Sequence, residues 1–214
     1  MGFELTVENA AAYLVRRGLV PAGAEVTVEE LPGGVSASVI AARVDGTGVV
    51  AKQALGRLRV RDEWLAKRER TETEVAAMRL CAGLTPACVP RVLDSDPAEH
   101  TMVMELLPPD ARNWQQEVAA GRVHPGAGRW AGETLGTWHA GTAGVSQRFD
   151  DFEAFEQLRL RPFHETVMRR LPELAPAIEP HLSVLRAQRR CLVHGDYSLK
   201  NMLIGRSGRY VLDF

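Results

Sequence analysis

The sequence lacks the features that would place the protein outside the ordinary globular class. It has only three cysteines, Cys81, Cys88 and Cys191, with no CxxC spacing. An odd number without paired spacing argues against a disulfide framework or a zinc site and fits reduced cysteines in a cytosolic protein. No apolar run approaches the roughly 18–20 residues that span a bilayer, and no signal peptide opens the chain. We expect a cytoplasmic protein without a membrane partner.

A strong excess of charge is also missing. The formal net charge is −1 at pH 7, which gives no general attraction to nucleic acid or to an anionic membrane. One basic run, GRLRVRDEWLAKRER at 56–70, mixes its arginines with Asp62, Glu63 and Glu69. Mixed signs are typical of a solvated helix face. We therefore expect no nucleic-acid partner.

Lysine is scarce among the basic residues. Of the 26 lysines and arginines, only Lys52, Lys67 and Lys200 are lysine, a bias that suggests a GC-rich genome. A lysine that persists against this bias indicates a position where a compact ammonium group on a flexible stem is needed instead of a planar guanidinium.

The remaining composition, 45% hydrophobic and 25% charged over 214 residues, suits one large domain or two small lobes around a cleft. Thr6 is expected to cap a helix over 7–17. The turn DGTG joins two of the expected strands. Alternating residues predict an antiparallel sheet from three runs: EVTVEEL, SVIAARV and VVAKQA. A helix is expected at 62–83, between Asp62 and Pro90.

Two more short strands, RVLDSD and HTMVMELL, precede the proline break PPD at 108–110. From 111 to about 190 the pattern is helical, punctuated by Pro172, Pro176 and Pro180. CLVHGD and a terminal hairpin then return to short strands. The sequence thus predicts an α+β fold with a small β-rich lobe at 1–107 and a mainly helical lobe at 108–214.

The end of the chain, HGDYSLKNMLIGRSGRYVLDF, places Asp196, Asn201 and Asp213 at a defined spacing. Phosphoryl transfer from a nucleotide needs a carboxylate that accepts the proton of the attacking hydroxyl, together with ligands for magnesium. The pattern H-x-D-x-x-x-x-N, followed by a strand that ends in Asp-Phe, supplies these groups. The alternative is an ordinary hairpin in which Asp196 forms an Asx-turn that Asn201 caps. The apolar LV before HGD and the later VLDF favour phosphoryl transfer.

Phosphoryl transfer predicts further parts upstream. Gly33, Gly34 and Ser36 lie in a glycine-rich hairpin whose backbone N–H groups suit phosphate oxygens, although no G-K-[ST] follows as in a P-loop. Lys52 lies in the next strand-like run. An isolated strand lysine is usually a solvated edge residue, but the scarcity of lysine and the preceding glycines favour a phosphate contact.

Two more parts are expected between this lysine and the lobe boundary. Glu74 lies where the helix at 62–83 turns apolar, so it should face the sheet and pair with the lysine, in preference to Glu72 on another face. The segment TMVMELLPP is expected to bind adenine, with backbone groups from Glu105 and Leu107 and with Met104 against the ring. The alternative, a buried strand, is compatible with that function.

With these motifs in order, the chain resembles the aminoglycoside phosphotransferase and choline kinase family, which is related to the protein kinases. The resemblance covers nearly the whole chain, and HGD in place of HRD favours the small-molecule branch. It rests on these segments: GGVSASV, VVAKQ, the helix with Glu74, VMELL, LGTWHAG, LVHGDYSLKN and VLDF. The resemblance implies a two-lobed protein-kinase-like fold that uses ATP and Mg²⁺.

The resemblance also implies a role for each position. Asp196 would be the catalytic base, Asn201 and Asp213 would bind Mg²⁺, and Glu74 would anchor Lys52 against the α- and β-phosphates. The remaining nucleotide contacts would be Gly33, Gly34, Ser36, Met104, Glu105 and Leu107. Lys200 replaces the glycine that commonly precedes this asparagine, and the resemblance gives it no role.

Members of the family typically continue past the Asp-Phe motif with several helices. The resemblance therefore implies that the helical lobe is incomplete and that the chain is a truncated kinase, which can be inactive. The acidic run FDDFEAFE at 149–156 could receive a cationic acceptor, but Asp150 and Asp151 as helix caps are the favoured interpretation.

We expect transfer of the ATP γ-phosphate to a hydroxyl of a small molecule. An aminoglycoside, and hence antibiotic resistance, is favoured. Choline, homoserine, methylthioribose, fructosamine and macrolides stay open as acceptors. The alternative class is a non-catalytic nucleotide-binding fragment or pseudokinase. The sequence indicates no oligomeric state.

Overall fold

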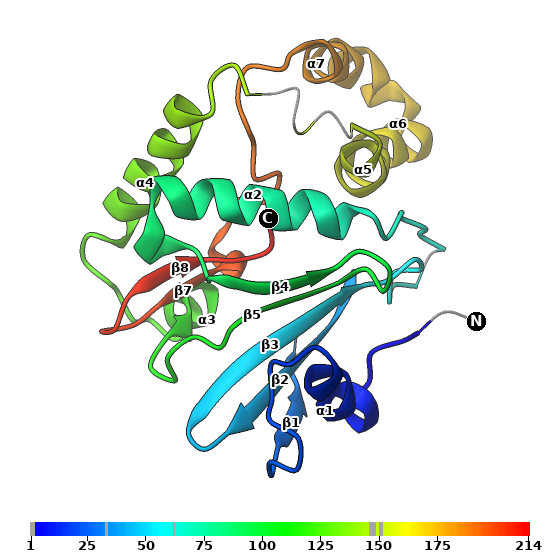
Figure 1. The fold of residues 1–214 in the computed structure, drawn as a ribbon. Helices are drawn as coiled ribbons and strands as arrows, with labels where there is room; N and C mark the ends of the chain where they lie inside the picture. Colours follow the sequence, from blue (N-terminus) through cyan, green and yellow to red (C-terminus); the bar gives the residue numbers. More distant parts are fainter. Residues whose placement is uncertain (1–2, 33, 62, 146–148, 150–151) are drawn as a thin grey trace. The chain divides into compact units, whose positions relative to one another are not determined.

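A computed structural model describes residues 3–32, 34–61, 63–145, 149 and 152–214. Their contacts form two compact units, residues 1–125 with 198–213, and residues 126–197 with Phe214. Each unit is described by itself below and is drawn in Figure 1. The lobe boundary between residues 107 and 108 stays a prediction.

The first unit contains two antiparallel sheets, ordered β1-β2-β3-β5-β4 and β6-β7-β8. Their strands are β1 (Thr27–Glu30), β2 (Ala37–Val44), β3 (Thr47–Ala54), β4 (Val92–Asp96), β5 (Thr101–Glu105), β6 (Arg112–Asn113), β7 (Met202–Ile204) and β8 (Arg209–Val211). The helices of this unit are α1 (Val7–Arg16), α2 (Arg70–Leu84) and α3 (Trp114–Ala119). The predicted α+β class with a β-rich first part is confirmed.

The β2–β3 hairpin forms where the sequence predicts it. Asp45 and Gly46 join the two strands, and both have left-handed φ angles, 47° and 79°. A two-residue turn with two positive φ angles matches the right-handed twist of the flanking strands. This turn fixes the register that pairs Val39 with Lys52.

Helix α1 packs on one face of the five-stranded sheet. Its Tyr13 and Leu14 form a buried cluster with Ile40, Ala51 and Val103 from three strands. Because side chains alternate along a strand, Ala51 on this face places its neighbour in sequence, the predicted site lysine, on the opposite face.

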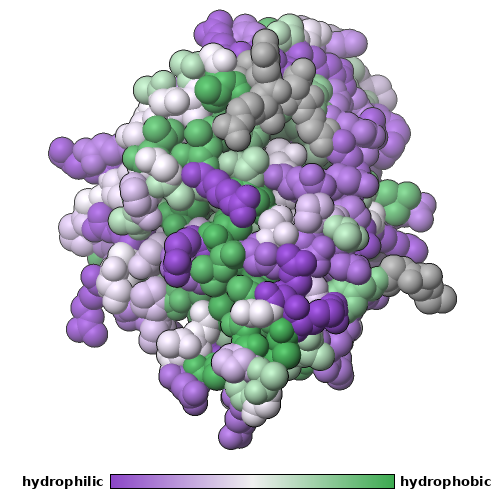
Figure 2. Space-filling view, viewed as in Figure 1, coloured by the Kyte–Doolittle hydropathy of each residue, from purple (hydrophilic) through white to green (hydrophobic). Residues whose placement is uncertain are grey.

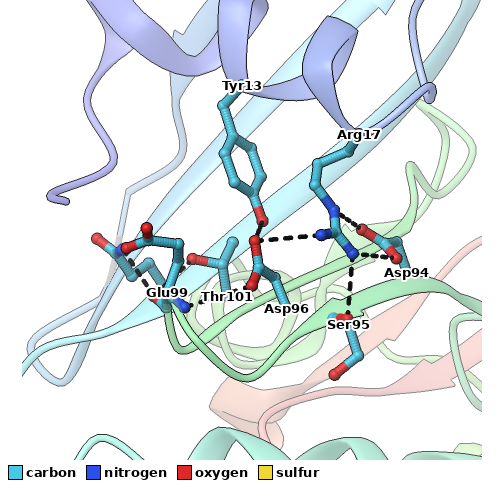
Figure 3. Close-up of polar contacts among 8 residues, drawn as sticks. Tyr13, Arg17, Asp94, Ser95, Asp96, Glu99 and Thr101 are labelled. Atoms are coloured by element: carbon cyan, nitrogen blue, oxygen red, sulfur yellow. Dashed lines mark hydrogen bonds and ion pairs between the residues drawn. The ribbon is translucent and has the colours of Figure 1, made fainter.

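Polar contacts join the end of α1 to β4, as Figure 3 shows. Arg17 Nε donates to Asp94 Oδ2 at 2.6 Å, and Arg17 Nη2 donates to Asp94 Oδ1 at 2.8 Å. Tyr13 Oη donates to Asp96 Oδ2 at 3.2 Å. A bidentate arginine–carboxylate pair fixes orientation as well as distance, so these contacts set the direction of α1 along the sheet.

Helix α2 runs alongside β4 in Figure 1 and also contacts β3 and β5. Its buried apolar side chains are Val75, Ala77, Met78 and Cys81. They recur at the three- and four-residue spacing of one helix face. The apolar half of the expected helix is therefore the part that packs on the sheet.

The prediction that the polar segment before residue 70 is helical is wrong. The prediction began at residue 62, but α2 begins at Arg70. The chain before it closes on itself through two backbone hydrogen bonds: Leu58 N to Trp64 O at 2.9 Å and Ala66 N to Gly56 O at 3.0 Å. Burial of Leu58 and Ala66 stabilises this loop over a helix. Asp62, the expected cap, lies outside the described residues.

The second unit is helical, as predicted for this part of the chain. It contains α4 (Ala127–Gly141), α5 (Phe152–Phe155), a π-helix (Glu156–Glu165), α6 (Thr166–Arg170) and α7 (Ala175–Ala187). Pro162 lies inside the π-helix. In an α-helix its ring would clash with the carbonyl of residue 158. The wider π turn relieves that clash.

Three predicted boundaries differ from the structure. CLVHGD is not a strand, since Gly195 has φ 78° and Leu192 N donates to a side chain, Thr142 Oγ1, at 3.0 Å. The helix expected from residue 111 is preceded by the strand β6, after which Asn113 Oδ1 caps α3 by accepting from Gln116 N. The last helix, predicted over PHLSVLRAQRR at 180–190, instead starts at Ala175, because Pro176 is tolerated in its first turn.

Among the described residues, no helix is both long and apolar enough to cross a membrane. Hydrophobic and hydrophilic residues are mixed on the face drawn in Figure 2. Several apolar side chains of the second unit are exposed: Phe163, Leu171, Leu174, Val184, Leu185 and Val193. Scattered exposed apolar residues are normal on a folded protein.

Candidate active site

Lys52 lies in the middle of β3 and points to the sheet face opposite α1. Its Nζ donates to Glu74 Oε1 at 2.6 Å and to Asp213 Oδ1 at 2.5 Å. The side chains of Lys52 and Glu74 are each only 12% exposed. The structure thus brings together three predicted site residues from β3, α2 and the end of the terminal hairpin. Glu72 is exposed and makes no such contact.

The two carboxylates determine the protonation of this lysine. Burial alone lowers the pKa of Lys52, but Asp213 and Glu74 outweigh it and hold the pKa above its ordinary value. Burial raises the pKa of Glu74, and the charge of Lys52 opposes that rise. The lysine is therefore a firmly charged ammonium group, as a phosphate contact requires.

Asn201 and Asp213 lie at the open end of the β7–β8 hairpin. The register pairs Met202 with Val211, and Leu212 N then donates to Asn201 O at 2.8 Å. The asparagine is buried, whereas the Asp213 side chain is 45% exposed. An antiparallel hairpin thus brings two residues that are distant in sequence to one edge.

This pair fits a magnesium ion by its chemistry. Carboxylate and amide oxygens are hard ligands, and Mg²⁺ is usually held by one or two carboxylates, with water and substrate phosphates completing its shell. The exposed Asp213 carboxylate leaves room for such a shell. Within the described part of the chain, no group of three or more acidic, histidine or cysteine side chains could hold a metal by itself.

The glycine-rich hairpin lies just before β2. A Cβ at Gly34 would approach Ala37 O to 2.4 Å, so no other residue fits this backbone path. Ser36 lies at the end of the loop, where its carbonyl accepts from Leu55 N at 2.9 Å. Gly33 lies outside the described residues. The loop therefore leads into β2, and its end is hydrogen-bonded to the residue that follows β3, the strand that carries Lys52.

The expected adenine segment follows from β5. Its register pairs Val50 with Met104, so Met104 shares a sheet face with Lys52. Glu105 N donates to Arg91 O at 3.0 Å, which occupies one of the backbone groups expected to contact the base. Leu107 N has no acceptor among the described residues. The N–H of Glu105 is therefore used within the chain, and the contacts of Glu105 and Leu107 with a base stay a prediction.

Asp196 lies in the loop that follows α7, in the second unit. Its backbone N donates to His194 Nδ1 at 3.3 Å. The His194 ring packs against Phe214 with centroids 4.9 Å apart, and Tyr197 Oη donates to Ala131 O at 2.7 Å. Contacts on both sides hold the loop, and the carboxylate of Asp196 is partly exposed.

Sequence reasoning missed two arginines that contact predicted residues. Arg159, from the π-helix, donates from Nε to Gly195 O at 2.8 Å and has Nη2 3.9 Å from Asp196 Oδ2. Arg70, the first residue of α2, donates to Ser36 O at 2.5 Å. Arginine is so common in this chain that its type gives no signal. Only the position of Arg70, four residues before Glu74, points to it.

The acidic run at 149–156 and Lys200, whose roles the sequence left open, make contacts within the chain. Glu156, at the end of the acidic run, accepts from Arg186 Nε at 2.7 Å, and Arg186 also contacts Glu165. Asp150 and Asp151 lie outside the described residues. Lys200 is exposed, and Asn113 Nδ2 donates to its carbonyl at 2.7 Å.

Kinase-like folds have a β-rich unit in which a strand lysine lies between two carboxylates, next to a glycine-rich hairpin. The first unit of this chain has these features. The family model described as "Phosphotransferase enzyme family" matches residues 27–214. The chain belongs to this family and is a phosphotransferase.

Solved structures share the fold. Spectinomycin phosphotransferase APH(9)-Ia, in complex with ADP and spectinomycin, is 12% identical with a TM-score of 0.59, over 99% of this chain and 69% of that chain. Aminoglycoside phosphotransferase APH(4)-Ia is 14% identical with a TM-score of 0.55, over 97% of this chain and 71% of that chain. A comparison with curated protein sequences finds no match.

Proposed function

We propose that this phosphotransferase moves the γ-phosphate of ATP to a hydroxyl group of a small molecule. One observation carries the proposal: Lys52 is held between Glu74 and Asp213 at 2.6 and 2.5 Å. The two acids keep this ammonium group charged and fix its position, so it can contact an anionic polar ligand. The anionic phosphates of a nucleotide are the ligand that we propose for this ammonium group.

Each residue of this centre has a distinct part in binding ATP. Lys52 contacts the α- and β-phosphates, and Glu74 keeps its ammonium group in place. Gly34 and Ser36, with Gly33, let the backbone approach the phosphates. Asn201 and Asp213 would hold Mg²⁺, which would neutralise charge on the phosphates when bound.

The base moiety is received by the end of β5. Met104 lies on the sheet face that carries Lys52, where an apolar side chain can pack against adenine. Leu107 offers its backbone N–H to the ring, and Glu105 offers its carbonyl group. A mostly apolar site with a few directed hydrogen bonds is typical of nucleotide and cofactor pockets.

Asp196 acts on the acceptor. Its carboxylate orients the acceptor hydroxyl and takes its proton as the oxygen attacks the γ-phosphorus. The bond from that phosphorus to the β,γ-bridging oxygen breaks, and ADP leaves. Arg159 and His194 fix the loop that carries this carboxylate.

An aminoglycoside is the favoured acceptor, because the structural neighbours include spectinomycin and aminoglycoside phosphotransferases. Resistance to such an antibiotic would follow. Choline, homoserine, methylthioribose, fructosamine and macrolides stay as other acceptors. Glu156 and Glu165 share Arg186, so they add little negative charge for a cationic acceptor. The free cysteines fit a cytoplasmic enzyme.

The nucleotide part is tested by calorimetric titration of ATP, with and without Mg²⁺. We expect magnesium-dependent binding by the wild type, weakened about tenfold or more by Lys52→Met, since a charged hydrogen bond contributes about 1.5–3 kcal/mol. Lys67→Met is the matched control and should bind normally. Equal affinities in all three proteins would refute the phosphate contact.

The catalytic part is tested with Asp196→Ala. A positioned base contributes about 10²–10⁴-fold, so phosphate transfer to acceptors should fall by that factor while ATP affinity persists. Turnover like that of the wild type would remove Asp196 from the reaction. A wild type that binds ATP but modifies no acceptor would favour the alternative, a non-catalytic nucleotide-binding module.

A further inference from the structure

The guanidinium of Arg70 makes four hydrogen bonds to backbone carbonyls. Its two terminal nitrogens, Nη1 and Nη2, both donate to backbone carbonyls. Nη2 donates to Ser36 O at 2.5 Å and to Leu55 O at 2.9 Å. Nη1 donates to Lys67 O at 2.5 Å and to Ala66 O at 3.4 Å. All four hydrogens on these nitrogens are therefore used.

The carbonyls belong to three segments that the Arg70 side chain joins. Ser36 ends the glycine-rich hairpin, and Leu55 follows β3, the strand of Lys52. Ala66 and Lys67 belong to the loop that leads into α2. Ser36 O also accepts from Leu55 N at 2.9 Å, so Arg70 reinforces a junction that the backbone begins.

Partial burial of the Arg70 guanidinium costs free energy, because it removes a charge from water. Burial lowers the pKa of Arg70, while the charges of Glu74 and Asp213 oppose that change. In the described part of the chain, no carboxylate comes within ion-pair distance of its guanidinium. Arg70 is partly buried, and removing a charge from water without a paired acid costs free energy unless hydrogen bonds satisfy it; here four backbone carbonyls do so. A planar fork with several donors can join separate carbonyls, which an ammonium group cannot do as well.

We propose that Arg70 is a positioning residue for the phosphate site: it fixes the end of the glycine-rich hairpin to the start of α2. Arg70 and Glu74 are four residues apart in α2, so they lie on the same helix face. The arginine thus ties Glu74, and through it the ammonium group of Lys52, to the loop that ends at Ser36. This inference rests on the proposed use of ATP.

The test compares the affinities of Arg70→Gln for ATP and for adenosine, measured by calorimetry with Mg²⁺ present. If the arginine positions the phosphate site, ATP affinity falls about tenfold, equivalent to losing one charged hydrogen bond. Adenosine affinity, which depends on the base site, stays within about twofold. A residue that only stabilises the fold would leave the ratio of the two affinities unchanged.

Arg68→Gln is the matched control. Arg68 also donates to carbonyls beside this junction, to Ala54 O at 3.0 Å and Glu99 O at 3.3 Å, but it does not contact Ser36. We expect a lower melting temperature with ATP affinity kept. The same loss of ATP affinity in both variants would overturn the inference, because it would then reflect general destabilisation.

Arg70→Lys decides the matter if the glutamine variant does not melt cooperatively. Lysine keeps the charge but cannot join the carbonyls of Ser36 and Leu55 as a fork, so ATP affinity should still fall at least about threefold. Normal ATP affinity in Arg70→Lys would overturn the inference alone. A folded wild type that binds no ATP would overturn the proposed function, and the inference with it.

Discussion

Replacement of Glu74 by glutamine separates the charge of this side chain from its shape. The carboxylate accepts from Lys52 Nζ at 2.6 Å, and both side chains are 12% exposed. Glutamine has the same size and keeps one oxygen that can accept from the lysine. The change therefore removes one negative charge and leaves the packing of α2 on the sheet intact.

The effect on stability should be small. A hydrogen bond to a charged group contributes about 1.5–3 kcal/mol, and one between neutral groups about 0.5–1.5 kcal/mol. The weaker bond to glutamine thus costs about 1 kcal/mol. Relief from burying a carboxylate offsets part of that cost. The free energy of unfolding should change by less than about 1 kcal/mol.

The effect on ATP should be larger. Without the charge of Glu74, the ammonium group of Lys52 should move toward Asp213 and away from the position expected for phosphate. Loss of one such contact is equivalent to about a tenfold rise in the KM for ATP, with a smaller change in kcat. Steady-state kinetics at saturating acceptor measure both constants, and urea unfolding measures the stability.

Glu72→Gln is the control for this prediction, because Glu72 lies two residues earlier in α2 and is exposed. Its KM for ATP should equal that of the wild type, and its stability should stay within about 0.5 kcal/mol. If Glu74→Gln behaves like Glu72→Gln in both assays, the pairing of Lys52 with Glu74 has no function in nucleotide binding.

Two further predictions concern the glycine-rich hairpin and the acid stability. Gly34→Ala should shift the loop, since its Cβ would lie 2.4 Å from Ala37 O, and ATP affinity should fall. Gly83→Ala has open space in α2. It should instead raise the melting temperature, because alanine stabilises a helix by about 0.5–1 kcal/mol relative to glycine. The hydrogen bond from Arg122 lowers the pKa of Glu117 to about 2. This carboxylate therefore stabilises the fold above its ordinary pKa, and that stability is lost as the pH falls toward 2. Glu117→Gln should flatten this acid limb in pH-dependent unfolding, and an unchanged limb would refute the assignment.

The elements that the sequence predicts correctly are those set by local pattern. Asp45 and Gly46 can form only a few tight turns, and the alternating residues on both sides then pair in one register. Val75, Met78 and Cys81 repeat at helical spacing and face the sheet. In both cases the local preference and the tertiary contacts agree, so the pattern alone is enough.

The elements that the sequence misplaces depend on contacts between distant residues. The segment before α2 has helical composition, but Leu58 and Ala66 are buried by folding back as a loop. CLVHGD has the residues of a strand, but among the described residues no strand pairs with it; the Leu192 N–H instead donates to Thr142, which follows α4. A single sequence does not encode which distant partner is present.

The candidate site follows the same division. Glu74 could be chosen over Glu72 because helical periodicity decides which carboxylate faces the sheet. Asn201 and Asp213 could be paired because a hairpin brings both to one edge. Arg70 had no signal beyond its position four residues before Glu74, since its partners are carbonyls at Ser36 and Leu55. Carbonyl groups belong to every residue and carry no sequence signal.

The charges of this centre explain why magnesium should matter. Lys52 and Arg70 supply two positive charges, and Glu74 and Asp213 supply two negative charges, so the cluster is neutral as a whole. A neutral cluster has little attraction for a triphosphate at a distance. Under the proposed function, ATP would therefore arrive with its own counter-ion, and Asp213, the more exposed of the two acids, is the side chain proposed to receive it. If ATP bound equally well without Mg²⁺, this charge balance would be the wrong account of the site.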